Sequence, residues 1–392
     1  ISAVPKNSVL IAKDFTPSMT SQINKDNVSA IVTEVGGVTS HSAILARAMG
    51  IPAVLSVVGA VDSIADGEQL IVDGFKGKVF ISPSDAELEE YSAKQQAYLE
   101  ERESLNEYFG KPTVTKSGIV KKVYGNIGKA EDAQNVVQNG GEGIGLFRTE
   151  FLFMDREHQP TEDEQFEAYS TVAKAMDNKE VIIRTLDIGG DKAIDYLSIE
   201  KEDNPFLGYR AIRYCLGNKE LYKTQLRAIL RAAQFGNIKI MLPLVTTVDE
   251  VKQAKALIKE CCDELENEGL RYRNVPVGVM IETPSAALIS DLLAKEAEFF
   301  SIGTNDLTGY TMAVDRGNAN VSYLYDVFQP AVLRAIEMTI KNAKAAGIQV
   351  GMCGEAAADE RLIPMLIDWG LDEFSVTPSS ILQTRKSICL ND

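Results

Sequence analysis

One of the two histidines in this 392-residue chain stands where an imidazole could act as a nucleophile. His41 follows a Gly-Gly pair at 36–37 and precedes an amphipathic stretch that predicts a helix over 42–49. Glycines adopt backbone conformations that other residues resist, and Thr39 and Ser40 can cap the helix. Free N–H groups of a first helical turn attract anions, so the position suits a phosphoryl group on His41. The plainer alternative is a surface histidine in a strand-to-helix connection.

Two carboxylates, Glu282 and Asp306, come after apolar runs that are typical of buried strands. Two carboxylates, completed by water and substrate oxygens, are a usual way of holding Mg²⁺. Each residue could instead cap the helix that follows it, because acidic and amide side chains favour that position. The arginines that accompany the two carboxylates favour the metal.

Four arginines are expected near the same strand ends: Arg148, Arg184, Arg210 and Arg316. Guanidinium groups bind phosphate and carboxylate in a bidentate manner. Such a set beside a divalent cation predicts a small, highly anionic phosphocarboxylate as substrate. Arg210 differs from the others, since it is expected at the start of a helix rather than at a strand end.

The five cysteines suggest neither a disulfide framework nor a zinc site, because they are odd in number and none has CxxC spacing. Cys353 alone suggests chemistry, since it lies in a turn of small residues over 351–355 that follows an expected strand.

The elements that must position these residues form two patterns. Short strands over 9–12, 30–34, 53–58, 69–73 and 78–82, with the helix over 42–49, predict a small α/β domain at 1–84. The segment 85–115, rich in Glu, Lys, Gln and Ala, is expected to be an exposed helical linker.

Strands and helices alternate over the remaining residues, 116–392. Eight strands are expected, at 122–126, 143–147, 181–186, 239–244, 277–281, 299–303, 349–353 and 373–376. About eight such units over this length predict a (β/α)8 TIM barrel, with a doubly wound open sheet as the alternative. In a barrel, catalytic groups collect just after the strands. The residues that fall there are Asn126, Arg148, Thr149, Glu150, the run Arg184 to Asp187, Glu282, Asn305, Asp306, Cys353 and Glu355.

Composition limits the partners of the chain. Forty basic and 56 acidic residues give a net charge of −16, which argues against nonspecific binding to nucleic acid or anionic membranes. No apolar run reaches the roughly 18 residues of a membrane span, and the first ten residues lack the pattern of a signal peptide. We expect a cytoplasmic protein.

Several strings in the chain resemble the phosphoenolpyruvate-utilising enzymes, and within them the Enzyme I group of the bacterial sugar phosphotransferase system. They are the turn at His41, the Arg-Thr-Glu-Phe-Leu-Phe-Met-Asp-Arg string at 148–156, the Arg-Thr-Leu-Asp-Ile-Gly-Gly-Asp-Lys string at 184–192, the segment 301–307, and Met-Cys-Gly-Glu at 352–355. The similarity is collinear from about Val9 to the C-terminus.

The resemblance implies magnesium-assisted transfer of a phosphoryl group from phosphoenolpyruvate to a histidine, with release of pyruvate. A histidine of the carrier protein HPr would be the next acceptor, and the barrel would form a homodimer. His41 would be the nucleophile, and Cys353 would protonate the enolate carbon, with a thiol pKa near neutrality. Glu282 and Asp306 would bind Mg²⁺. The substrate-binding residues would be Arg148, Arg184, Arg210, Asn305 and Arg316.

The chain also departs from the family pattern. Val38 stands where an arginine is often found, Gly309 where glutamine is usual, and Ala358 where glycine is usual. The family's N-terminal strand and HPr-docking helical insertion, and the last barrel helix, are expected to be missing, so the chain resembles a product truncated at both ends.

Two other functions fit part of this pattern. Pyruvate phosphate dikinase and phosphoenolpyruvate synthase share the histidine domain and the barrel, but the short linker and the string at 148–155 favour the Enzyme I group. A catalytically silent module that senses phosphoenolpyruvate is a second alternative. Retention of His41, both carboxylates and Cys353 argues against it.

Overall fold

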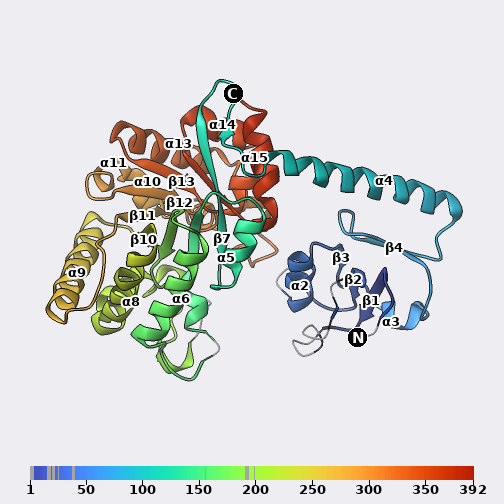
Figure 1. Ribbon diagram of the computed structural model, residues 1–392, viewed down its shortest axis with the longest axis horizontal. Coiled ribbons are helices and arrows are strands. Elements are labelled where there is room, and N and C mark those ends of the chain that lie inside the picture. The colour runs from blue at the N-terminus through green and yellow to red at the C-terminus, as the bar shows by residue number, and fades with distance from the viewer. Residues whose placement is uncertain are drawn as a thin grey trace. The chain divides into compact units, whose positions relative to one another are not determined.

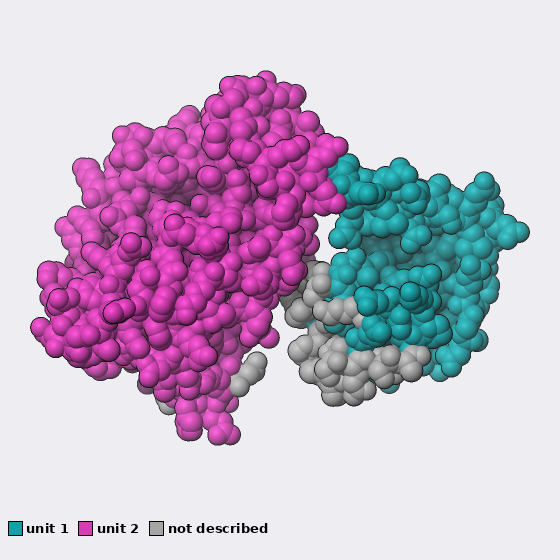
Figure 2. Space-filling model, viewed as in Figure 1, with its two compact units in different colours: residues 1–104 teal, residues 105–392 magenta. Residues whose placement is uncertain are grey.

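The computed structural model describes residues 4–15, 19, 23–24, 26–37, 40–154, 156–189, 194–197 and 199–392, without the side chains of 41, 44, 47 and 48. The chain divides into two compact units, Ile1–Ser104 and Leu105–Asp392 (Figure 2). Each has its own apolar core. The structure divides the chain between Ser104 and Leu105. The domain boundaries expected after residues 84 and 115 stay predictions.

The first unit is built on a small parallel sheet. Its strands are β1 (Ser8–Ala12), β2 (Val28–Thr33) and β3 (Ala53–Val54), in that order, and a hairpin is formed by β4 (Leu70–Asp73) and β5 (Lys78–Ile81). The helices are α2 (His41–Met49), α3 (Ala60–Ser63) and α4 (Asp85–Ser104). Phe15, Ile31 and Ala46 pack together in its core.

The strand expected over 53–58 is shorter in the structure and ends at Val54. Ser56 adopts a φ of 58°, which is incompatible with extended backbone. Its hydroxyl donates a hydrogen bond of 2.7 Å to the carbonyl oxygen of Gly36. Just beyond it, the backbone N–H of Val57 donates a hydrogen bond of 2.9 Å to the carbonyl oxygen of Thr33, the last residue of β2.

Helix α4 has no buried residue, in keeping with its charged composition. It still contacts the hairpin of its own unit through aromatic side chains. The rings of Phe80 and Tyr91 are 5.1 Å apart, and those of Phe75 and Tyr98 are 5.6 Å apart.

The second unit is a closed barrel of parallel strands (Figure 1). Its eight strands are β7 (Val120–Ile127), β8 (Ile144–Arg148), β9 (Val181–Arg184), β10 (Ile238–Leu242), β11 (Val277–Ile281), β12 (Phe299–Ile302), β13 (Gln349–Met352) and β14 (Glu373–Val376). The pairing of β14 with β7, from Glu373 with Lys122 to Val376 with Gly125, closes the sheet. The alternative of an open sheet is therefore wrong. A short strand, β6 (Thr113–Val114), adds antiparallel to β7.

Helices surround the strands on the outside (Figure 1). They are α5 (Asp132–Gln138), α6 (Glu162–Ala175), α7 (Ile212–Gly217), α8 (Lys219–Ala232), α9 (Val248–Asn267), α10 (Pro284–Leu288), α11 (Ser290–Leu293), α12 (Thr304–Met312), α13 (Pro330–Ala345), α14 (Ile363–Trp369) and α15 (Ile381–Cys389). Side-chain caps fix the starts of several. At α9, Thr247 and Glu250 form a reciprocal capping box.

The expectation that the last barrel helix is missing is wrong. α15 follows β14, and its buried side chains Ile381 and Ile388 belong to the main core of the unit. Arg385, also buried, donates hydrogen bonds to Thr113 Oγ1 at 3.1 Å and to the carbonyl oxygen of Gly140 at 2.8 Å.

Side chains fill the inside of the barrel. A separate apolar cluster of Leu146, Ile182, Met241, Met280, Phe299 and Cys353 lies there, with members from six different strands or strand ends. The barrel is thus a packed core whose functional groups must lie at its ends. Among the helices of the described residues, none is both long and apolar enough to span a membrane.

Candidate active site

The predicted site residues of the barrel gather at the carboxyl ends of its strands. Arg148 and Arg184 are the last residues of β8 and β9, whereas Glu282 and Cys353 directly follow β11 and β13. Because all eight strands are parallel, these ends form one face of the barrel. We call this face the barrel mouth.

A chain of ion pairs connects the arginines of the barrel mouth. Arg184 Nη2 lies 2.7 Å from Glu150 Oε1, and Arg184 Nη1 lies 3.3 Å from Asp187 Oδ2. Asp187 Oδ1 in turn accepts a hydrogen bond of 3.0 Å from Arg210 Nη2, which also lies 3.3 Å from Asp306 Oδ2. Carboxylates therefore hold both guanidinium groups in place before any substrate binds.

Both arginines of these ion pairs are buried. Arg184 and Arg210 are 7% and 4% exposed. Burial lowers the pKa of each, but the charges of the neighbouring carboxylates, Asp187 among them, outweigh it and raise the pKa above the usual arginine value. The Nε atoms of both arginines are buried and have no hydrogen-bond partner within the described residues. A guanidinium group that is held in place and still has an N–H free to donate is suited to binding an anionic ligand.

Arg210 does not start a helix, contrary to expectation. It lies between the short 3₁₀ helix Pro205–Leu207 and α7. Besides its two carboxylates, Arg210 donates a hydrogen bond of 3.1 Å to Tyr310 Oη and stacks over the Phe206 ring at 5.5 Å. Its position thus depends on contacts with α12 that spacing along the chain does not reveal.

Glu282 is almost completely buried, at 2% exposed, while 30% of the Asp306 side chain is exposed. Glu282 Oε1 accepts a hydrogen bond of 2.6 Å from the backbone N–H of Leu244. Burial raises the pKa of Glu282 to about 8, the negative charges of Asp306 and Asp187 add to the rise, and Arg184 and Arg210 oppose it.

The two carboxylates fit a divalent cation by their chemistry. A cation would relieve the repulsion that raises the Glu282 pKa, and both side chains offer hard oxygen ligands. A Cβ on Gly303 would lie 3.0 Å from Glu282 Oε2, so the glycine leaves that oxygen accessible. Within the described part of the chain, no group of three or more acidic, His or Cys side chains could hold a metal, so other ligands must complete the shell.

Cys353 is 4% exposed, and its thiol lies 3.7 Å from the carbonyl oxygen of Ile302. Burial raises the pKa of the thiol to about 11, with Ser301 and Arg184 opposing the rise. This is higher than the near-neutral value expected from the sequence. The thiol therefore keeps its proton at neutral pH, which is the form that a proton donor needs.

The other predicted residues lie at the same end of the barrel. Burial lowers the pKa of Arg148, and the nearby charge of Arg184 lowers it further, while Cys353 is among the groups that raise it. Tyr325 Oη donates a hydrogen bond of 2.9 Å to the carbonyl oxygen of Asn305. Burial raises the Tyr325 pKa and the adjacent Arg316 lowers it, so the exposed Arg316 lies beside this tyrosine.

Four residues that position the predicted ones are given no role of their own by the sequence, although Glu150 and Asp187 are expected after their strands. Glu150 and Asp187 lie inside the strings at 148–156 and 184–192, where an acidic residue near each arginine was the available signal. Tyr310 and Tyr325 contact the site from α12 and from the loop after it, and nothing in their spacing indicates this.

His41 begins α2, and its side chain lies outside the described residues, as do Val38 and Thr39. The surrounding turn is described in part. Gly36 has a φ of 116°, which favours glycine, and Ser40 Oγ accepts a hydrogen bond of 3.3 Å from the backbone N–H of Ala43. Ser42 donates a hydrogen bond of 3.3 Å to Asp14 Oδ1.

Two further residues, Gly309 and Ala358, differ from the pattern of the family, and neither disturbs the barrel mouth. Gly309 lies inside α12, and a Cβ there would come no closer than 3.4 Å to the carbonyl oxygen of Val314. Ala358 ends the short 3₁₀ helix Glu355–Ala358.

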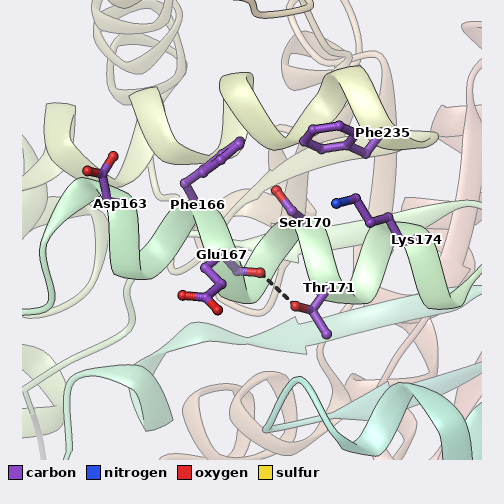
Figure 3. Close-up of a pocket in the computed structure, with 7 residues that line it drawn as sticks. All are labelled: Asp163, Phe166, Glu167, Ser170, Thr171, Lys174 and Phe235. Atoms are coloured by element: carbon purple, nitrogen blue, oxygen red, sulfur yellow. Dashed lines mark hydrogen bonds between the residues drawn. The ribbon is translucent and has the colours of Figure 1, made fainter.

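A surface hollow of about 430 Å³ lies elsewhere, lined by residues of α6 and by Phe235, which ends the 3₁₀ helix Ala233–Phe235 (Figure 3). Lys174 lies over the Phe235 ring at 4.2 Å, and Thr171 donates a hydrogen bond of 2.8 Å to the carbonyl oxygen of Glu167. The hollow is lined by none of the predicted site residues.

Comparison with known families decides the relationship. A model of the PEP-binding domain of PEP-utilising enzymes matches residues 102–391, and a model of their mobile domain matches residues 4–77. The chain belongs to the PEP-utilising enzyme family.

Two relatives within this family carry the same activity name. Phosphoenolpyruvate-protein phosphotransferases from Bacillus subtilis and Staphylococcus carnosus are 50% and 48% identical to this chain over 388 residues, which is 99% of this chain and 68% of each relative. The solution NMR structure of an Enzyme I protein is 42% identical over 25% of this chain and 39% of its own, with a TM-score of 0.23. The relatives from Bacillus subtilis and Staphylococcus carnosus favour the phosphotransferase branch over the dikinases and synthases.

Proposed function

We propose that the chain transfers the phosphoryl group of phosphoenolpyruvate to His41 and releases pyruvate, as a phosphoenolpyruvate-protein phosphotransferase. In this step the imidazole nitrogen forms a bond to phosphorus while the bond from phosphorus to the enol oxygen breaks. The observation that carries the proposal is the network Arg184–Asp187–Arg210–Asp306, which fixes two buried guanidinium groups and joins one of them to the candidate metal ligand Asp306. The charge of Glu282, the other candidate ligand, also acts on both arginines.

Phosphoenolpyruvate carries a phosphate and a carboxylate, so it needs more than one cationic contact. We assign these contacts to Arg148, Arg184, Arg210, Asn305 and Arg316. The first three are fixed by strand ends or by ion pairs, whereas Arg316 lies on an exposed loop beside Tyr325. Positioning and charge neutralisation contribute most to phosphoryl transfer, so rigid arginines suit this reaction.

Glu282 and Asp306 are the proposed ligands of Mg²⁺. When bound, the ion would neutralise negative charge on the substrate's oxygens. The protein's own contribution is the placement of the two carboxylates: the Leu244 N–H orients Glu282, and Arg210 orients Asp306.

Cys353 is the proposed acid. After phosphorus leaves, the three-carbon product is an enolate, and C3 must gain a proton to give pyruvate. The protonated thiol of Cys353 supplies that proton, and a thiolate remains. Asn126 Nδ2 donates a hydrogen bond of 3.0 Å to the carbonyl oxygen of Cys353 and fixes the turn that carries the thiol.

The next acceptor of the phosphoryl group and the oligomeric state of the chain are proposals that rest on the family resemblance. The acceptor would be a histidine of HPr, and the assembly would be a homodimer through the barrel. The cytoplasmic location stays a prediction.

A single-turnover assay tests the proposed reaction. The chain is mixed with a small excess of phosphoenolpyruvate and Mg²⁺, and pyruvate is measured with time. We expect a burst of pyruvate that approaches one molecule per chain and that chelation of the metal abolishes. Absence of the burst with a chain that binds phosphoenolpyruvate would favour the silent sensing module instead.

A further inference from the structure

A carboxyl group with a buried oxygen atom lies inside the barrel, below the barrel mouth, and the proposed reaction does not use it. It belongs to Glu373, the half-buried first residue of β14. Phe374 packs in the core between strands and helices, so alternation along the strand turns Glu373 into the barrel. A Cβ on Gly145 of β8 would collide with Glu373 Oε1, and a Cβ on Gly351 of β13 would lie 2.7 Å from Oε2. Two glycines on different strands therefore make room for this carboxyl group.

Strand register places this carboxyl group close to the proposed acid. Ser301 of β12 pairs with Gly351 of β13, which pairs with Glu373 of β14. These three residues lie at one level of the barrel, and paired strands are about 4.8 Å apart. Since the middle residue has no side chain, the hydroxyl of Ser301 and the carboxyl of Glu373 can approach each other across it.

Cys353 lies directly above this level. It is two residues beyond Gly351, so its side chain points to the same face of the strand. Ser301 and Glu373 both affect the pKa of the thiol, which places the three groups in one neighbourhood. Ser301 Oγ and Glu373 Oε1 are buried, and neither has a hydrogen-bond partner within the described residues, so each is free to exchange a proton with a neighbour.

The surroundings of Glu373 favour its neutral form. Burial raises its pKa to about 8, the charges of Glu180 and Asp372 add to the rise, and Lys239 opposes it. Tyr124, whose own pKa is raised by burial and by Glu373, faces it from β7. At neutral pH this group is therefore mostly a carboxylic acid with a proton to give.

The opposite end of this path reaches water. Lys239 Nζ lies 2.8 Å from Glu180 Oε2, and the two side chains are 19% and 20% exposed. Lys239 is near the start of β10, and Glu180 immediately precedes β9, so the pair lies at the end of the barrel away from the mouth.

We propose that Glu373 acts through Cys353 by returning a proton to its thiolate along the inside of the barrel, with Ser301 as the link and the Lys239–Glu180 pair as the point of exchange with water. A bound substrate covers the mouth, and this path reaches the thiol from the other side. The inference rests on the proposed role of Cys353 as the acid.

The proton transfers balance without any further reactant. Cys353 gives its proton to C3 of the enolate, and the thiolate takes the hydroxyl proton of Ser301. Ser301 takes the carboxyl proton of Glu373 at the same time, so its hydroxyl is restored. The Glu373 carboxylate then takes a proton from water at the Lys239–Glu180 end.

Two isotopes followed in one exchange experiment test this path. The chain is incubated in D₂O with Mg²⁺, phosphoenolpyruvate and ¹³C-labelled pyruvate. Carbon exchange between the two compounds reports phosphoryl transfer and protonation together. The deuterium found at C3 of pyruvate is first corrected by subtracting the amount found with Cys353→Ser. The remainder is divided by the number of carbon exchanges. This ratio reports how fast the proton on Cys353 exchanges with water.

Glu373→Gln keeps the shape of the side chain but removes its acidic proton. We expect carbon exchange within about twofold of the unmodified chain, and deuterium incorporation per exchange lowered at least about tenfold. Ser301→Ala should have the same effect, and provides a second test if the Gln variant folds poorly. The control, Glu337→Gln on the exposed face of α13, should leave both isotopes unchanged.

The outcomes separate the two proposals. Unchanged deuterium incorporation per exchange in both Glu373→Gln and Ser301→Ala would overturn the internal path while leaving the reaction intact. A parallel loss of carbon exchange and deuterium would make Glu373 a structural residue only. Absence of carbon exchange in the unmodified chain would instead count against the proposed function itself.

Discussion

At the scale of single residues, each proposed role depends on the protonation state that burial imposes. Arg184 and Arg210 stay charged because carboxylates face them, and Cys353 keeps its proton because burial raises its pKa. Burial and the charges of Asp306 and Asp187 raise the pKa of Glu282. None of these states follows from residue type alone, since each requires the neighbours that the barrel assembles.

Replacing the proposed acid tests one of these roles. In Cys353→Ser the phosphate- and metal-binding residues remain, but a serine hydroxyl is far too weak an acid to protonate the enolate at neutral pH. We expect pyruvate formation to fall by about 10²- to 10⁴-fold while phosphoenolpyruvate affinity changes little. A coupled assay and a substrate titration measure the two quantities.

Cys262→Ser, on the partly buried side of α9, is the matched control and should behave as the unmodified chain. Turnover of Cys353→Ser at the level of this control would mean that Cys353 is a packed small residue at a strand end.

The raised pKa of Glu373 also predicts how stability varies with pH. Its folded-state pKa of about 8 lies above the unfolded value of about 4.3, so the folded state holds more protons between those values. Glu373 therefore lowers stability progressively as pH rises from about 4 to about 8. Thermal unfolding of Glu373→Gln should show a gain in Tm over the unmodified chain that is larger at pH 8 than at pH 5. A gain independent of pH would show that Glu373 titrates normally.

At the scale of elements, the strand ends were the most predictable part of the site. The spans expected for the fifth and eighth barrel strands match β11 and β14. β11 is a short apolar run between turn residues, whereas β14 alternates polar Glu373 and Ser375 with apolar Phe374 and Val376. The residues after these strands could then be assigned to one face. Arg210, Tyr310 and Tyr325 could not be assigned to this face in the same way. Their positions depend on irregular loops and on contacts between elements distant in the sequence.

The strands of the first unit were less predictable. The strand expected over 53–58 ends after two residues because Ser56 adopts a φ of 58°, which no apolar pattern encodes. The last barrel helix is expected to be missing on the family resemblance alone, whereas α15 follows β14 and buries Ile381, Arg385 and Ile388. The first error comes from a local backbone conformation, and the second from the resemblance rather than from any pattern in 381–389.

The ends of β11 and β12 carry the proposed metal ligands, and their removal tests the assignment. Glu282→Ala or Asp306→Ala removes one of two hard oxygen ligands, so the ion would depend mostly on water and substrate. We expect Mg²⁺-dependent affinity for phosphoenolpyruvate to fall about tenfold or more in either variant. Titration calorimetry with and without Mg²⁺ measures it.

Glu260→Gln, on the outer surface of α9, removes an acidic side chain far from these strand ends and serves as control. If both site variants kept the metal dependence of the control, the two carboxylates would be helix caps or ion-pair partners only.

At the scale of the whole molecule, the two units have separate cores and are joined by a helix that has no buried residue. We expect calorimetry to show two unfolding transitions, one for each unit. Phosphoenolpyruvate with Mg²⁺ should raise the Tm of the barrel alone, because its proposed ligands all lie in the second unit. His41→Ala, changed only in the first unit, should show the same shift. One cooperative transition that moves as a whole would contradict the independence of the units.

Mapping of a transferred phosphoryl group tests the proposed reaction most directly. The chain is incubated with phosphoenolpyruvate labelled in its phosphate and with Mg²⁺, and the label is located by peptide mapping under conditions that preserve phosphohistidine. We expect label on His41 alone, lost without Mg²⁺ and absent from His41→Ala, although that variant still binds phosphoenolpyruvate. Label on His158 or any other residue, or label that persists in His41→Ala, would contradict the proposal.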